Sequence, residues 1–377
     1  MHNHRQHNHY IHMILKNKEL RDMYLALSLK TLAMSMVGIF IPIFLIVERG
    51  MDLGGIILFY FFASLGYILT APFAGKFVSR FGLKNSAMLT IPMFIIFYLG
   101  MFSSENLGFS LNYLALFLGI TQAMYWIPFT THFVRSSDKR HRSEEVGLLS
   151  AIMIVSSMSG PFFGALVINW LGFGFLFKLA SGLLALGIIP LMFTKYNHES
   201  FRCRLKDIRK IPGRLTLKMF AFGATNTVEL VFWPVFLFSV VNAYTSFGLI
   251  FLIAEFGSLL GAMWLGSIED RNKLLKILRI GGILCSFIWL SRVFLTGAIV
   301  LAAVTIVGAF LHNLVEIPFN TLEYDRFVKK KYLAEFVVFR GILESVGRIV
   351  LLGILAIFMH YNAAFLTSSL MYLTYLF

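Results

Sequence analysis

The sequence has few charged residues, since Asp, Glu, Lys and Arg make up only 14% of its 377 residues. A soluble domain carries about 25%, so this chain lacks the polar surface that would cover a soluble core. Instead it holds repeated apolar runs of about 18 residues or more, each long enough to cross roughly 30 Å of hydrocarbon as a helix. The sequence therefore predicts an all-α integral membrane protein.

Cysteine is also scarce, with Cys203 in a basic segment and Cys285 in an apolar run. One pair so placed gives neither a disulfide framework nor a zinc spacing. The N-terminal tail is rich in histidine, at His2, His4, His7, His9 and His12. Such a tract can bind a transition metal, but it is more often a disordered tail or an expression tag. We expect no metal site and no cofactor.

The net charge of +14 does not indicate nucleic-acid binding, because the basic residues lie in short loops between apolar runs. Alternate loops hold nearly all of them, and the remaining loops have little beyond Arg49, Lys178 and Arg292. The positive-inside rule then places both termini and every even-numbered loop in the cytoplasm. No cleavable signal peptide is apparent. We expect a multi-pass protein of the inner (plasma) membrane.

Hydropathy predicts about twelve spans joined by short loops. Their approximate limits are 23–47, 53–75, 86–103, 109–134, 146–168, 172–194, 218–241, 246–266, 277–295, 297–318, 334–358 and 362–377. The expected organisation is a cytoplasmic tail (1–22), a six-helix half (23–194), a basic linker (195–217) and a second half (218–377). The last span is short, which indicates either a shorter helix or a clipped sequence.

The two halves are copies of one unit, because short motifs recur at nearly one offset. The matched pairs are Pro42 and Pro234, Pro128 and Pro318, and Gly75 and Gly266, which lie 192, 190 and 191 residues apart. A single Phe-x-Pro match in membrane helices is unremarkable, but a shared offset is hard to obtain by chance. Since six is an even number, the repeats are parallel and related by an axis along the membrane normal.

The loop after the second span, GKFVSRFGLK from Gly75 to Lys84, resembles the Gly-x-x-x-Asp-Arg-x-Gly-Arg-Lys signature of the major facilitator superfamily, with Ser79 in place of Asp. A second copy begins at Gly266 and keeps an Asp-Arg pair. The resemblance implies a small bacterial transporter with the fold of this family. It also implies a gate formed by Gly75, Arg80, Gly82, Lys84, Gly266, Asp270 and Arg271.

The fifth span contains Gly160, Pro161 and Gly164, which resemble part of the Gly-Pro motif of the family's antiporters. The fourth span lacks the arginine that many of its proton antiporters carry. The resemblance implies a secondary transporter that works by alternating access around a central cavity. We expect it to be proton-coupled, an exporter of drugs or metabolites, and a monomer whose partners are a small solute, protons and the bilayer.

Removing the loop charges leaves a short set inside the spans: Lys30, Glu229, Glu255, Glu316, Arg340, Glu344 and Arg348. Each costs about 2.5–3.5 kcal/mol near the bilayer centre unless it has a partner or water. The near balance of acids and bases indicates pairing in one shared interior. Nearly all of these charges lie in the second copy, so we expect the coupling chemistry there.

These charges allow more than one interpretation. Glu229 and Glu255, near mid-depth, are candidate proton carriers or permanent partners of an arginine. Arg340, Glu344 and Arg348 share a helix face, which either lines the cavity or forms an ion-paired packing seam in which Glu344 satisfies both arginines. Lys30 either faces the cavity or extends to the cytoplasmic interface.

Other residues and other functions remain open. Expected cavity-lining residues, which could equally be interhelical contacts, are Gln122, Tyr125, Trp126 and Asn226. A lipid or lysolipid transporter of the same fold is one alternative function. A membrane-embedded enzyme is another, with His312 and Asn313 as its best candidates, but they stand without a recurring partner pattern. The arginines and Lys30 suit an anionic solute, whereas the glutamates suit a cation.

Overall fold

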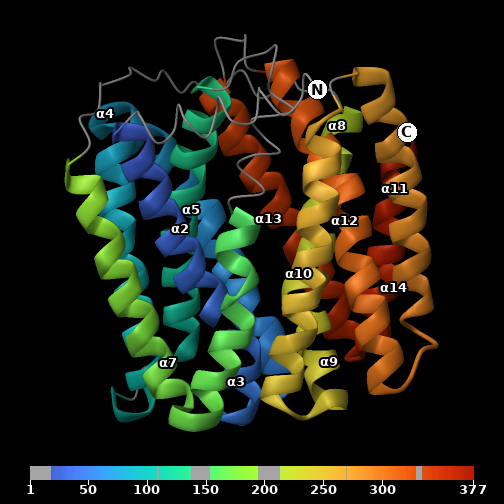
Figure 1. The fold of residues 1–377 in the computed structure, drawn as a ribbon, viewed down its shortest axis with the longest axis horizontal. Coiled ribbons are helices and arrows are strands. Elements are labelled where there is room, and N and C mark those ends of the chain that lie inside the picture. The colour runs from blue at the N-terminus through green and yellow to red at the C-terminus, as the bar shows by residue number, and fades with distance from the viewer. Residues whose placement is uncertain (1–17, 108–109, 137–152, 194–212, 269, 328–332) are drawn as a thin grey trace, which may run out of the picture.

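The structure is a computed structural model that describes residues 18–107, 110–136, 153–193, 213–268, 270–327 and 333–377. This part of the chain is a bundle of long helices and contains no β-strand. The helices run roughly parallel and antiparallel to one another (Figure 1). Nine helical stretches of the described chain are long and apolar enough to cross a membrane.

The described chain makes twelve passes when each fused helix is divided at its turn and each short helix is joined to the helix that it continues. Helix α4 (Leu53–Leu107) turns back at Gly82, where φ is 78°. Helix α7 (Gly160–Phe193) turns back in the same way at Gly172, where φ is 77°. Only glycine adopts such a backbone easily. The last pass is short, formed by α14 (Tyr361–Tyr372) and a 3₁₀ turn (Leu373–Leu376). The predicted fold class is confirmed.

The remaining helices complete the two halves. They are α2 (Lys18–Gly38), α3 (Ile41–Val47), α5 (Leu111–Ser136), α8 (Gly213–Thr227), the π-helical turn Val228–Phe232, α9 (Trp233–Val241), α10 (Tyr244–Gly266), α11 (Arg271–Ser291), α12 (Ala298–Phe327) and α13 (Leu333–Phe358).

The repeat seen in the sequence has the same local structure in both copies. Pro42 lies in the first turn of α3 and Pro234 lies in the first turn of α9. Each of these short helices continues a longer one after a break in regular α-helix, at residues 39–40 in the first half and at the π turn in the second. Pro128 and Pro318 both lie inside a long helix, α5 and α12.

Several predicted limits of the spans were wrong, including the start of the ninth, which lies at Arg271 rather than 277. The tenth span continues to Phe327 rather than ending at 318. The seventh begins at Gly213 rather than 218, and the ninth ends at Ser291 rather than 295. Helix α12 continues through polar residues because these residues have partners inside the protein. The histidines of the N-terminal tail and most of the predicted basic linker lie outside the described residues.

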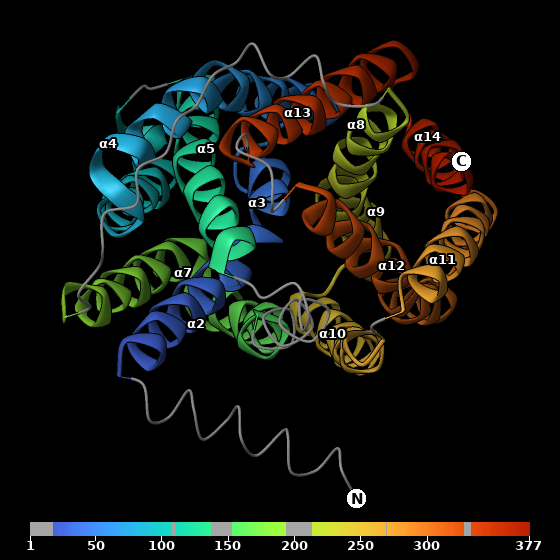
Figure 2. The same cartoon turned by 90° about the horizontal axis from the view of Figure 1, so that it is seen from above.

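Figure 2 shows α2 to α7 on one side of the molecule and α8 to α14 on the other. Helices α5 and α12 lie nearer the middle, whereas α11 and α14 lie at one edge. Glycine permits close crossing within each half. Gly160 and Gly164 place α7 against α2, at Ser35 and Met36, and in the second half Gly223 and Gly347 place α8 against α13.

The two halves touch directly at the end that holds α3 and α9. Phe40 packs against Phe247 with ring centroids 5.7 Å apart, and Phe173 packs against Tyr244 at 5.8 Å. Gly248 on α10 meets the carbonyl of Pro161 on α7. These contacts bring the halves together at that end of the bundle.

Candidate substrate and coupling site

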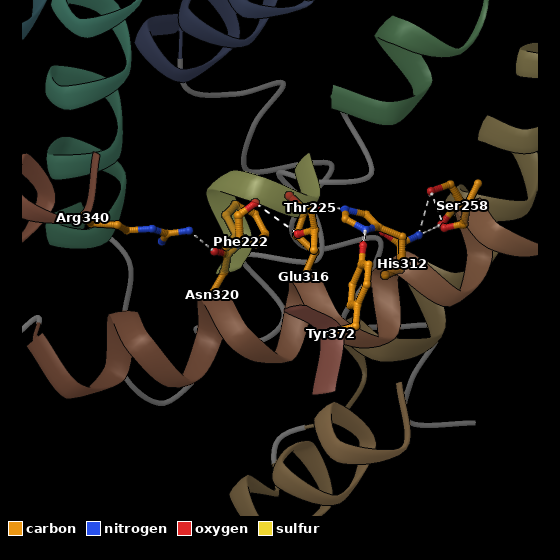
Figure 3. A network of polar contacts seen from close by, with 10 residues as sticks. Phe222, Thr225, Ser258, His312, Glu316, Asn320, Arg340 and Tyr372 are labelled. Carbon is orange, nitrogen blue, oxygen red and sulfur yellow. Dashed lines mark hydrogen bonds and ion pairs between the residues drawn. The ribbon is translucent and has the colours of Figure 1, made fainter. Parts of the chain in front are cut away.

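One face of α12 carries a row of polar side chains, because they are spaced at three or four residues: His312, Glu316, Asn320 and Glu323. Figure 3 shows the first three of them. His312 Nδ1 lies 2.9 Å from the hydroxyl of Tyr372 on α14. Its Nε2 lies 3.4 Å from Glu316 Oε2, and the Glu316 side chain is 40% exposed. The row thus joins a histidine, a phenol and an accessible carboxylate.

Glu255 on α10 lies within electrostatic range of Glu316, His312 and Glu229. It forms no hydrogen bond or ion pair with any described residue. One turn further along α10 lies Ser258. The Asn313 amide donates to the Ser258 carbonyl at 2.7 Å and to the Ser258 Oγ at 2.8 Å. These bonds hold α12 against α10.

Arg340 on α13 is the centre of a second cluster. It donates through Nε to Glu344 Oε1 at 2.7 Å and through Nη2 to Asn320 Oδ1 at 2.7 Å. Its Nη1 lies 3.1 Å from Glu323 Oε2. Sequence reasoning missed Glu323, because the tenth span was expected to end before it. One arginine therefore faces two carboxylates in a buried environment.

Arg348 lies two turns further along α13 and differs from Arg340. Its Cζ is 5.9 Å from the ring centroid of Tyr67 on α4. No carboxylate of the described chain lies within ion-pair distance of it. The idea that Glu344 satisfies both arginines is therefore wrong.

Arg292 was expected in a loop and lies in the turn that follows α11, but its side chain is fully buried. Its Cζ lies 3.9 Å from the ring centroids of both Trp233 and Trp289. Its Nη1 lies 3.8 Å from Glu229 Oε2, which belongs to the π-helical turn. Glu229 thus partners Arg292 rather than Arg340 or Arg348. The two tryptophans in the seventh and ninth spans were the available signal for this site.

In the first half, Lys30 does not extend to the interface. Its side chain is buried, and Nζ forms no hydrogen bond. The ammonium lies over the ring of Tyr125 and 4.9 Å from the ring centroid of Phe94. Gln122, Trp126 and Asn226, the other expected lining residues, are half-buried.

The expected gate residues lie at the turns between neighbouring spans. Asp270 caps α11 by accepting a hydrogen bond from the Asn272 backbone N–H at 2.8 Å. Gly82 forms the turn inside α4. Arg80 and Arg271 are exposed, whereas Gly75 and Gly266 are buried. The side chain of Lys84 lies outside the described part.

Among the described residues, no group of three His, Cys, Asp or Glu side chains is placed to hold a metal ion. The arrangement instead offers buried charges of both signs, carried by helices that cross the bundle. Such a set can bind a charged solute and exchange protons, because intramembrane ionisable groups typically mark solute and proton paths.

Comparisons with known proteins agree with this fold. Multidrug resistance protein 2 of Bacillus subtilis is 30% identical over 160 residues, which is 40% of this chain and 38% of that protein. A multi-drug resistance efflux pump PmrA homolog of Lactococcus lactis subsp. lactis is 21% identical over 323 residues, 80% of this chain and 78% of that protein.

Solved structures share the fold at low identity. The human organic anion transporter MFSD10 (TETRAN) gives a TM-score of 0.68 at 14% identity, covering 95% of this chain and 98% of that one. The E. coli fucose:proton symporter FucP gives 0.68 at 14% identity, covering 96% and 98%. The sequence profile of the Major Facilitator Superfamily matches residues 23–352. The chain therefore belongs to the Major Facilitator Superfamily and has the fold of its transporters.

Proposed function

We propose that this transporter exports a small solute across the plasma membrane in exchange for protons, by alternating access. Two relatives named as multidrug resistance proteins support the direction and the broad choice of solute. The Gly160, Pro161 and Gly164 motif, which packs tightly on α2, supports antiport. Both termini would then lie in the cytoplasm, beside the basic loops.

The position of Glu255 is the observation that supports proton coupling. This carboxyl lies beside the His312–Glu316 pair and has no fixed partner among the described residues. A carboxyl without a permanent cation can gain and lose a proton as its surroundings open and close. Glu229 is less suited to this role, because its Oε2 lies 3.8 Å from Nη1 of the buried Arg292 and so has a partner within the protein.

The movement itself would be a rocking of one half against the other. At the α3–α9 end the halves meet through aromatic rings, such as Phe40 on Phe247 and Phe173 on Tyr244. Apolar contacts of this kind separate without leaving a charge exposed to hydrocarbon. Each half keeps its own glycine crossings and so moves as one body.

The test uses the purified protein in liposomes with a pH gradient and ethidium as the transported probe. Glu255→Gln should lose gradient-driven ethidium transport by at least about tenfold, while exchange of ethidium without a gradient persists. Glu48→Gln is the control, because Glu48 is an exposed carboxylate at the end of α3. It should transport as the wild type does.

Full gradient-driven transport by the Glu255→Gln variant would reject proton coupling through this carboxyl. Transport of ethidium by the wild type that is indifferent to the pH gradient would reject antiport with protons altogether. The same liposomes loaded with a pH-sensitive dye report whether proton movement accompanies ethidium.

A further inference from the structure

The ammonium of Lys30 is buried and has no counterion. Its side chain belongs to α2, is only 4% exposed, and its Nζ forms no hydrogen bond. No charged group of the described chain interacts with it electrostatically. Burying a charge without a counterion is strongly unfavourable, so a group from outside the described chain is expected to complete this site.

The rings around Lys30 hold its ammonium in place without neutralising it. Nζ lies over the face of Tyr125 and 4.9 Å from the ring centroid of Phe94. A desolvated cation–π contact stabilises the ammonium by less than the cost of removing the charge from water. The rings also leave the three N–H donors without an oxygen acceptor. The ammonium therefore retains its capacity to bind an anion.

An aromatic surface continues from this point along α5. Phe129 stacks on Tyr125 with centroids 5.6 Å apart and an angle of 15°. Trp126 meets Phe129 edge to face at 5.8 Å. Both Trp126 and Phe129 are half-buried, so part of each ring can accept another flat group. Gln122 precedes Tyr125 by one turn on the same face and adds an amide.

We propose that Lys30 and the α5 rings form a binding site for an organic anion that carries an aromatic group, such as an aromatic carboxylate. The carboxylate would pair with the Lys30 ammonium, and the apolar body would lie against Trp126 and Phe129. This assignment rests on the proposed function, since it adds a substrate class, aromatic anions, to the solutes that the proposed carrier binds. It also separates two tasks, because the glutamates of the second half then serve the proton.

A second lysine shows what an ordinary contact of this kind looks like. Lys178 Nζ lies 4.7 Å from the ring centroid of Phe102, but Lys178 is exposed. Its ammonium does not depend on a protein or ligand counterion, because it is solvated. Lys178 is therefore the matched control for Lys30: the residue type and the aromatic contact are the same, and the burial differs.

The experiment measures equilibrium binding to the purified full-length protein without any gradient. Three probes of one shape differ in charge: 1-naphthoate, 1-naphthylmethylammonium and 1-naphthalenemethanol. The wild type should bind naphthoate about tenfold more tightly than either other probe. Lys30→Met should lose that tenfold, Lys30→Arg should stay within about threefold of the wild type, and Lys178→Met should be unchanged.

Thermal unfolding gives a second readout. Naphthoate should raise the Tm of the wild type but not that of Lys30→Met. Without ligand, Lys30→Met should unfold at the same or a higher temperature, because it removes an uncompensated charge. A lysine that only supports the fold would give a lower Tm on removal. Lys30→Gln replaces Lys30→Met if the latter does not fold.

The proposal is overturned if the wild type binds the neutral or cationic probe as tightly as naphthoate, or does not bind naphthoate. It is equally overturned if Lys30→Met, or Lys30→Gln in its place, keeps the affinity of the wild type. Binding is measured without a gradient, so failure of proton-coupled ethidium transport does not affect this result. Conversely, coupled transport of ethidium with no preference for naphthoate rejects only the anion site.

Discussion

The charged residues inside the spans differ in whether the protein supplies their partner. Arg292 has Glu229, and Arg340 has both Glu323 and Glu344. Lys30 and Glu255 form no ion pair with the described residues. The paired charges have partners within the protein, whereas Lys30 and Glu255 are available to a solute and to a proton.

The Arg292–Glu229 pair should be required for stability. Glu229→Gln leaves the guanidinium buried between two tryptophans without a carboxylate, which costs about 3–5 kcal/mol when a buried pair is broken. The double variant Glu229→Gln with Arg292→Met should recover most of that loss, since no lone charge remains. Thermal unfolding in detergent, followed by tryptophan fluorescence, measures both. Simple additivity of the two single variants would contradict a coupled pair.

Arg340 and Arg348 offer a comparison on a single helix. Arg340→Met should lower stability by about 3–5 kcal/mol, because it leaves two buried carboxylates without their cation. Arg348→Met should cost less than about 1 kcal/mol, since Arg348 forms no ion pair with the described residues and lies 5.9 Å from the ring centroid of Tyr67. The melting temperatures of the two variants measure both losses of stability. Equal losses would show that position along α13, rather than ion pairing, sets the effect.

The pairing of charges was where sequence reasoning failed. A list of intramembrane charges does not give the rotation of each helix about its axis, and pairing depends on that rotation. Glu323 was assigned to a loop because it lies beyond Pro318 in a more polar stretch, yet α12 continues past it. Arg292 was correctly assigned to a loop, but a loop position does not show that its side chain is buried. Only the packed tryptophans reveal its burial.

At the level of helices, two glycines allow the chain to turn between consecutive spans. Gly82 and Gly172 have φ of 78° and 77°, with ψ of 168° and 173°. This region of backbone space is used almost only by glycine. The spans themselves were predictable from their hydropathy. The sequence did not show that the helix would continue on both sides of each turn, interrupted only at the glycine. The matched proline pairs were predictable because both copies of the repeat carry them at equivalent positions.

Gly172 allows a clean test of this requirement. No atom lies within 4 Å of where its Cβ would be, so Gly172→Ala adds backbone strain alone, about 1–3 kcal/mol. Gly182→Ala is the control, since Gly182 also has open space around it but lies inside a helix. That change should stabilise by about 0.5–1 kcal/mol. A Tm shift of the same sign in both variants would be inconsistent with the turn geometry.

At the level of the whole molecule, contact between the halves at the α3–α9 end depends on Gly248. A Cβ there would lie 2.7 Å from the Pro161 carbonyl oxygen and 2.8 Å from the Ala165 Cβ. Any side chain at this position therefore pushes α10 away from α7. If alternating access uses this contact, a larger residue should shift the population toward the state in which this end is open.

The reporter is a cysteine at Ala165, which is fully buried, in a background where Cys203 and Cys285 are replaced by alanine. A membrane-impermeant maleimide should label Ala165→Cys slowly in the parent and at least about tenfold faster when Gly248→Leu is added. Gly257→Leu on the same helix is the control, because its Cβ would have only the Ile306 carbonyl nearby, at 3.8 Å. Equal labelling in all three proteins would mean that Gly248 does not control the contact between the halves. Faster labelling confined to Gly248→Leu would instead identify α7 and α10 as the surfaces that separate during transport.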